Sequence, residues 1–338
     1  MTEGVSHKLD PNGDVLLTLH PSTSPFAPWD ERASAATVGK GERLTSQNGR
    51  SPDMHVTYKA ESIKYLLSSR HLALASRYFA SMLKWTGKEA STRKIDGLHY
   101  VDASGWDAQA FLVVMKAMHG KFRGISRCVD LEMLAKVAAI VDYYDCHESL
   151  EPLSTIWIEM LSRASPLPKT CDRDLLLWLL VSFVFRNETI FQHVTKTAIR
   201  ETKGPLPSLD RLPIRSSITD AIDQRREDII ERILKMLENQ AERFRNGSSG
   251  CKFECSATLL GLLVKNMAEH RLSHPTPSRP YTGYSVTGLE RSIRAFKNPP
   301  SCCPLSPFIV PTRIEKYDNI TAGLEIKEFL SDEDIADS

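Results

Sequence analysis

Residues 68 to 83 read SSRHLALASRYFASML, and this stretch decides how the first part of the chain folds. Its apolar residues recur at intervals of three and four, so they share one face of an amphipathic helix. Ser68 and Ser69 precede them, where a hydroxyl group can accept hydrogen bonds from the first unpaired backbone amides of a helix. The stretch therefore predicts a short helix that begins with capping serines and buries one face, formed by Leu72, Ala75, Phe79 and Met82.

The same serines lie close to His71 in the sequence, which raises the question of a nucleophile and its base. A nucleophilic serine needs a base within hydrogen-bond reach and an oxyanion site, usually on a turn flanked by glycines. No glycine flanks Ser68 or Ser69, and residues 69 and 71 diverge by about 200° around a helix. The chain also lacks the GxxxxGKS/T and GxGxxG phosphate-binding patterns. We therefore expect no enzyme activity, no catalytic residue and no cofactor, with His71 at the surface.

Strand-like segments lie on both sides of this helix. Residues 54–58 (MHVTY) and 63–67 (IKYLL) have the composition of a hairpin, and strand character resumes at 95–101. Residues 14–19 (DVLLTL) have the alternation of a strand with one buried side, which carries Val15, Leu17 and Leu19. These segments predict a small sheet beside the helix.

Residues 20–52 separate the first strand from the hairpin. They are rich in Pro, Ser, Thr, Gly and charged residues, a composition that cannot bury enough apolar area to offset chain entropy. We expect most of this segment to be a disordered insertion, within which Phe26 and Trp29 are able to dock locally.

Helical periodicity dominates the rest of the chain. In the long amphipathic segment at 218–244, the apolar spacing places Arg225, Arg226, Glu231 and Lys235 toward water. The aromatic residues of DYYDC and LLLWLLVSFVF are interpreted as core, because aromatics at helical spacing are more often buried. A Pro-rich connection and the acidic tail SDEDIADS follow the last predicted helix. The predicted helices lie in 106–120, 129–146, 151–161, 172–186, 218–244 and 256–269.

Composition limits the classes of function. The 338 residues carry a formal net charge of +1, so no global attraction to nucleic acid or anionic lipid is encoded. The N-terminus lacks the basic start and apolar run of a signal peptide, and the longest apolar run, 175–185, is shorter than the ~20 residues that span a bilayer. Seven cysteines, an odd number, fit a reducing compartment. We expect an intracellular protein, cytoplasmic or nuclear, that does not span a membrane.

The order of strand, long loop, hairpin and short helix with a Ser-x-x-Phe motif resembles that of a BTB/POZ domain, and in particular that of fungal BTB/POZ proteins. The fungal members share segments similar to SSRHLxLAS, LAKxAxxVDYYxC, WIExL and LxWLxxSxVF, which all occur in this chain. The residues that carry the resemblance are Asp14–Leu17, Tyr65–Ser69, Leu72, Ser76–Phe79, Trp106–Asp107, Phe111, Leu134–Ala135, Ala138 and Tyr143–Cys146.

The resemblance implies an α+β fold, the BTB/POZ fold, in which a small β-sheet is clustered with α-helices and an all-α C-terminal region follows. The expected division is a flexible N-terminus at 1–11, a BTB/POZ domain at 12–150 that contains the insertion at 20–52, a helical domain at 151–300, and a C-terminal segment with an acidic tail at 301–338.

The chain departs from the BTB/POZ pattern at two places that bear on partners. BTB/POZ domains with a swapped dimer interface have an extra helix before the first strand, whereas here a short segment with Pro11 and Gly13 precedes it. Homodimer formation by that route is therefore not supported. Adaptors that recruit a cullin carry an apolar-x-Glu triplet, but the matching positions 87–89 read Gly-Lys-Glu. We expect a protein partner, with a cullin as one candidate, to contact the surface around Lys84, Trp85, Lys88 and Glu89 or the exposed apolar residues of the helices that follow the BTB/POZ region.

One metal pattern stands out near the end of the helical region. Cys251-x3-Cys255 precedes His270-x3-His274 with the spacing of a two-Cys, two-His zinc site. A continuous helix between them would place Cys255 and His270 about 22 Å apart, so we expect no metal at these four residues. Cys302 and Cys303 could complete a four-thiol set with the first two cysteines, but adjacent residues seldom direct both sulfurs at one ion.

These observations predict a non-catalytic protein-protein interaction module, a BTB/POZ scaffold or adaptor. One alternative is a substrate adaptor of a cullin-based ubiquitin ligase, supported by Glu89. A less favoured alternative is a zinc-dependent nucleic-acid-binding regulator, supported by the Cys251 to His274 pattern.

Overall fold

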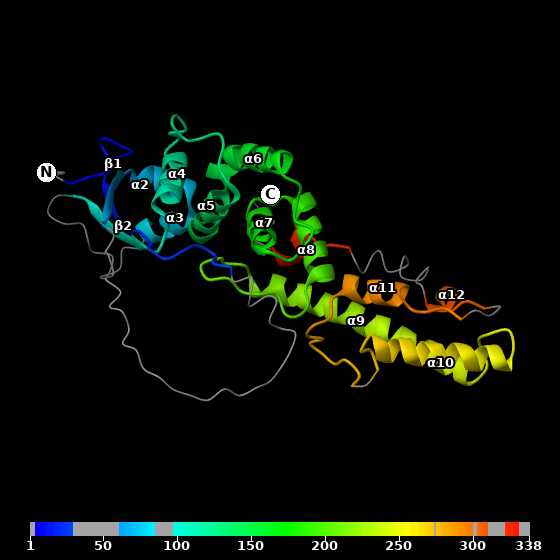
Figure 1. The fold of residues 1–338 in the computed structure, drawn as a ribbon. Helices are drawn as coiled ribbons and strands as arrows, with labels where there is room; N and C mark the ends of the chain where they lie inside the picture. Colours follow the sequence, from blue (N-terminus) through cyan, green and yellow to red (C-terminus); the bar gives the residue numbers. More distant parts are fainter. Residues whose placement is uncertain are drawn as a thin grey trace, which may run out of the picture.

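The computed structural model describes residues 4–29, 61–84, 97–273, 275–299, 303–309 and 322–330. Over these ranges the protein is a mixed α/β structure with a small sheet and mostly helices (Figure 1). The strand predicted at 54–58 and most of the insertion predicted at 20–52 lie outside the described residues.

The sheet has four strands in the order β1-β3-β2-β4. β3 pairs antiparallel with β2 and parallel with β1, and β4 pairs parallel with β2. The inward-facing residues of β2 are fully buried, as its alternation predicts. The strand predicted from residue 95 is described from residue 99 onward. The bounds are β1 His7–Lys8, β2 Val15–His20, β3 Ile63–Leu67 and β4 His99–Ser104.

The prediction of a flexible N-terminus is wrong for residues 6–10, because their backbone pairs with the outer edge of β3. Ser6 N donates to Lys64 O at 2.9 Å, and Leu9 N donates to Leu66 O at 3.0 Å. Backbone pairing of this kind does not depend on side-chain pattern, and a two-residue strand is too short to show alternation.

The stretch at 68–83 forms two helices instead of one, α2 at Ser69–Ala75 and α3 at Arg77–Lys84. The chain is extended at Ser76, with φ −148° and ψ 124°. The Ser76 hydroxyl donates to Tyr144 O and accepts from Phe79 N at 3.0 Å. The second helix therefore begins at its own cap, and the predicted apolar face survives the break because Leu72 and Phe79 are both fully buried.

The remaining helices begin with α4 and α5, which pack beside the sheet with α2 and α3 (Figure 1). α5 also packs against α6 and α7, while α9 and α10 lie side by side and extend away from the sheet. The six helices predicted between residues 106 and 269 are confirmed, whereas α8, α11, α12 and η2 were not predicted. No described helix has the length and apolar character needed to cross a bilayer. The bounds are α4 Ala108–Met118, α5 Leu131–Tyr144, α6 His147–Ala164, α7 Arg173–Val184, α8 Glu188–Glu201, α9 Ser216–Arg245, α10 Phe253–Glu269, α11 Val286–Arg294, α12 Ser306–Ile309 and the 3-10 helix η2 Ile326–Phe329.

Residues 21–29, the start of the predicted insertion, are packed between the two halves of the chain. Arg173 donates from Nε to Ala27 O at 2.8 Å and from Nη2 to Phe26 O at 3.0 Å. Ala27 N donates to Asp210 O at 3.1 Å, and both apolar side chains are buried. The expectation of disorder is therefore wrong for these residues, whereas the local docking of Phe26 is confirmed.

The structure also corrects the position of Arg226, which was predicted to face water. Its side chain is 0% exposed. Nη2 donates to Pro280 O at 2.6 Å and Nη1 donates to Tyr284 O at 3.4 Å, so α9 holds the loop before α11. Burial lowers the pKa of Arg226, and the charges of Asp223 and Glu227 oppose this effect. Periodicity missed this position because the guanidinium binds backbone carbonyls that the sequence pattern does not show.

We predict that Arg226→Met lowers the free energy of unfolding by about 2–4 kcal/mol, because Pro280 O and Tyr284 O lose a charged donor in a buried place. Urea titration followed by circular dichroism measures the loss. Arg232→Met, at an exposed arginine of the same helix, is the matched control and should change stability by no more than about 0.5 kcal/mol. Equal stability of the two variants would show that desolvation of the guanidinium cancels its hydrogen bonds.

Candidate functional site

The residues predicted to contact a partner lie at or beyond the edge of the described chain. Lys84 is the last residue of α3, and Trp85, Lys88 and Glu89 fall outside the described residues. Their role in partner binding stays a prediction from the sequence.

The serines at the start of α2 take part in hydrogen bonds, but they do not cap the helix. The Asp14 carboxylate accepts from Ser69 N at 2.8 Å and from Ser69 Oγ at 2.7 Å. Ser68 is buried and makes no side-chain cap hydrogen bond. The predicted capping role is therefore wrong, because a carboxylate at the start of β2 supplies the acceptor for the first turn of α2.

His119 completes this junction between α2 and α4. Its Nε2 accepts from Ser68 N at 3.1 Å, and its Nδ1 lies 2.8 Å from Met115 O. A neutral ring with the proton on Nδ1 satisfies both contacts. Burial lowers the pKa of His119, an effect that the hydrogen bond to Met115 opposes and the charge of His71 reinforces. His71 is exposed, as predicted, and stacks on His119 with 5.3 Å between ring centroids.

A partly exposed group of aromatic side chains lies where α3, α5 and the loop after β4 meet. We call Tyr78, Trp106 and Tyr143 the aromatic patch. The Tyr143 ring centroid is 5.5 Å from that of Tyr78 and 5.2 Å from that of Trp106. Tyr78 is 41% exposed and Tyr143 is 53% exposed, whereas Tyr144 beneath them is buried. The interpretation of DYYDC as core is therefore correct for Tyr144 and wrong for Tyr143.

A pocket of about 400 Å³ adjoins the aromatic patch, because Trp106 lines both. Its apolar wall also includes Phe26, Ala139 and Leu212, which come from three separate parts of the chain. The sequence gives no sign of this pocket, since it depends on how residues 21–29 and the loop before α9 fold over α5. Its largely apolar wall suits the apolar groups of a ligand or partner.

The charged side chains of the pocket already have hydrogen-bond or ion-pair partners within the protein. Asp107 caps α4 by accepting from Gln109 N and Ala110 N, each at 3.0 Å, and it pairs with Lys136 at 3.2 Å. Partial burial raises the pKa of Asp107, but hydrogen bonds from Ala110 and Lys136 outweigh burial and leave the pKa below its usual value. Arg211 donates to the backbone oxygens of Ser24 and Gly105.

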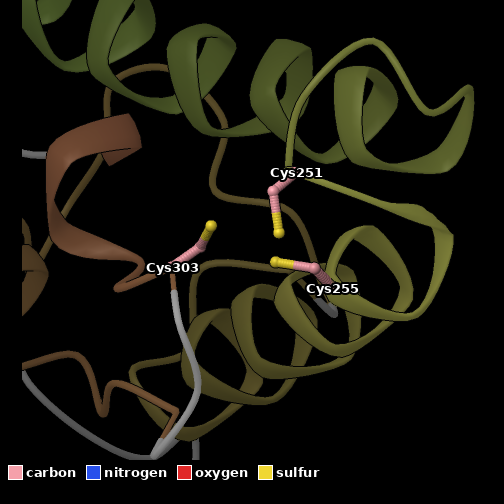
Figure 2. Close-up of side chains that lie close together, drawn as sticks. All are labelled: Cys251, Cys255 and Cys303. Carbon is pink, nitrogen blue, oxygen red and sulfur yellow. The ribbon is translucent and has the colours of Figure 1, made fainter.

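A second candidate site lies at the start of α10. Figure 2 shows the side chains of Cys251, Cys255 and Cys303 pointing toward one another. Their Sγ atoms all lie within 4.8 Å of one another. Cys251 is exposed in the turn before α10, Cys255 is buried in the first turn of α10, and Cys303 is partly buried just before α12. We call these three residues the thiol cluster, and thiolates in this arrangement are able to hold a soft metal ion.

His270 of the predicted zinc pattern does not join the thiol cluster. α10 is continuous from Phe253 to Glu269, so His270 lies about 22 Å from Cys255 along the helix axis. The His270 ring stacks on Phe296 with 5.2 Å between centroids. His274 and Cys302 lie outside the described residues. The four-thiol set considered from the sequence contained all three of these cysteines, but the fold was needed to show that Cys303 reaches the other two.

Comparison of the chain with protein-family models, curated proteins and solved structures finds no match.

We predict that the stability of the protein falls as the pH is lowered from about 7.5 to about 5 and that His119 contributes to this fall. Burial places the pKa of His119 below its unfolded value near 6.5, so the unfolded chain binds the proton first. The contribution of His119 is complete above that unfolded value and is lost as the pH falls toward the native pKa.

Urea unfolding at both pH values should show a smaller pH difference in His119→Gln than in the wild type. His193→Gln, which removes an exposed histidine on α8, is the matched control for loss of an imidazole. Nuclear magnetic resonance titration of the His119 ring checks the cause directly, and an apparent pKa at or above the usual histidine value would contradict it.

Proposed function

We propose that the protein is a non-catalytic protein-interaction module of the BTB/POZ type and that it binds a protein partner through the aromatic patch and the adjoining pocket. The order of β2, β3, the helix pair α2 and α3, β4, α4 and α5 supports this proposal, because it follows the order that the sequence resemblance implies. The residues of the resemblance that support a packed core include Leu72, Phe79, Phe111 and Leu134, all fully buried.

The single observation that carries the proposal is the exposure of the aromatic patch. Tyrosine and tryptophan are enriched at protein interfaces, where they bury a large area and order few side-chain torsions. Tyr78 and Tyr143 leave about half of their side chains in solvent although their rings contact each other. Arg77 and Asp145 form an ion pair at 3.6 Å next to the patch, which gives the apolar surface a polar rim.

The pocket supplies a second element of recognition. A partner side chain that enters it would contact Trp106, Phe26 and Leu212, beside the ion pair between Lys136 and Asp107. Aromatic and aliphatic anchors of this kind contribute most of the binding free energy at many interfaces. The partner is therefore a protein that presents an apolar side chain, flanked by polar groups that match the rim.

We predict that Tyr78→Ala combined with Tyr143→Ala weakens binding of the main partner about tenfold or more, because truncation removes two central contacts. Affinity purification of the tagged full-length chain from its native host, with an untagged control, identifies the partner by mass spectrometry. Titration calorimetry with the purified partner then measures the loss of affinity.

The matched control is Phe253→Ala, which removes an exposed aromatic ring on α10, away from the patch. It should bind the partner as tightly as the wild type. Equal binding by the double variant and the wild type would exclude the aromatic patch, and turnover of a substrate by the purified chain would exclude a non-catalytic role. Recovery of a cullin that depends on Glu89 would favour the ubiquitin-ligase adaptor.

A further inference from the structure

We propose that Cys251, Cys255 and Cys303 form a zinc-binding site that joins the turn between α9 and α10 to the segment before α12. This site is separate from the proposed partner surface and does not depend on it. It also differs from the two-Cys, two-His pattern, because the third ligand comes from the C-terminal segment and His270 takes no part.

The distances between the sulfur atoms fit a zinc ion. Tetrahedral zinc with Zn–S bonds of about 2.3 Å holds its thiolates about 3.8 Å apart. The three Sγ atoms lie within 4.8 Å of one another, so shifts of about 1 Å or less would bring them into coordination. Their convergence on one point is visible in Figure 2. A disulfide would instead draw two sulfurs to about 2.05 Å and leave the third thiol outside the bond.

Backbone geometry holds Cys251 over the first turn of α10. Gly250 has a φ of +100°, and a Cβ atom there would lie 3.2 Å from the Cα of Ser256. Only glycine combines this conformation with so close an approach. The Ser256 hydroxyl in turn donates to Phe244 O, which ties the start of α10 to the end of α9. Cys251 and Cys255 are therefore positioned by contacts that do not involve their own side chains.

Cys303 is positioned by the packing of the segment that follows it. Leu305 and Ile309 are buried, and the Phe308 ring lies 5.4 Å from the Phe244 ring of α9. Asn298 Oδ1 accepts from Leu305 N at 2.8 Å and from Ser306 N at 3.1 Å. The third sulfur is thus brought to the other two from a distant part of the sequence by an independent set of contacts.

The charge balance of binding is also favourable. Each of the three thiols loses a proton as it coordinates, so Zn²⁺ and three thiolates form a site of net charge −1. The first-turn backbone amides of α10 carry partial positive charge and stabilise thiolates at that end of the helix. With three protein ligands, zinc would leave its fourth position to a water molecule.

The test is the zinc content of the full-length chain, produced in zinc-supplemented medium and dialysed against a weak chelator. Inductively coupled plasma mass spectrometry should find about one zinc per chain in the wild type. Cys251→Ser and Cys303→Ser should each reduce it at least about tenfold, and Cys128→Ser, at an exposed cysteine outside the cluster, should keep it. Cobalt substitution should give thiolate charge-transfer absorption in the wild type and in Cys128→Ser only.

Two further measurements keep the result decisive. Cys251 is exposed and Cys303 only partly buried, so their serine variants should fold, and circular dichroism checks this. Removal of zinc by a strong chelator should lower the Tm of the wild type and leave that of Cys251→Ser unchanged. A zinc-free wild-type protein, zinc retained in all the variants, or a mass two hydrogens lower with Cys251 and Cys255 linked would each overturn the proposal.

Discussion

The packing of α5 holds the two halves of the chain together. Most of its residues are buried, and it contacts α3 and α4 on the side of the sheet and α6 and α7 on the other. Three of its residues, Ala135, Ala138 and Ala139, have small side chains, so neighbouring helices can approach it closely. α7 packs against α5 with bulky side chains and is buried on all sides from Leu175 to Val184. The only strongly exposed aromatic residue of α5 is Tyr143, near its end, so the aromatic patch is placed by the same helix that organises the core.

The sequence predicted the features that depend on local pattern. Alternation in β2 and helical periodicity in α4, α5, α9 and α10 located these elements, because burying one apolar face requires such a pattern. The pattern failed where a distant group decides the conformation. Ser76 interrupts a regular apolar face through its bond to Tyr144, and Arg226 is buried because Pro280 and Tyr284 offer carbonyl acceptors. Neither contact has a signature in the residues around it.

At the candidate sites, too, local pattern showed some residues and distant contacts decided the others. The close spacing of Cys251 and Cys255 was visible as a pair of possible ligands, but His270 of that pattern stacks on Phe296, and tertiary packing brings Cys303 to the other two sulfurs. Tyr143 and Tyr144 are adjacent and chemically identical, yet one is core and the other is surface. Adjacent residues on a helix differ by about 100° in direction, so composition alone could not separate their roles.

The aromatic patch with its pocket and the thiol cluster lie near opposite ends of the long helix α9. α9 has 30 residues and is therefore about 45 Å long at 1.5 Å per residue. Near its start, Arg215 lies over the Phe183 ring of α7 at 4.7 Å, and near its end Phe244 meets Ser256 and Phe308 beside the thiol cluster. A metal ion at the thiol cluster would stabilise the end of α9 without touching the aromatic patch. Each site can thus be disrupted separately, because the helix between them is held along its length by its own buried face and by Arg226.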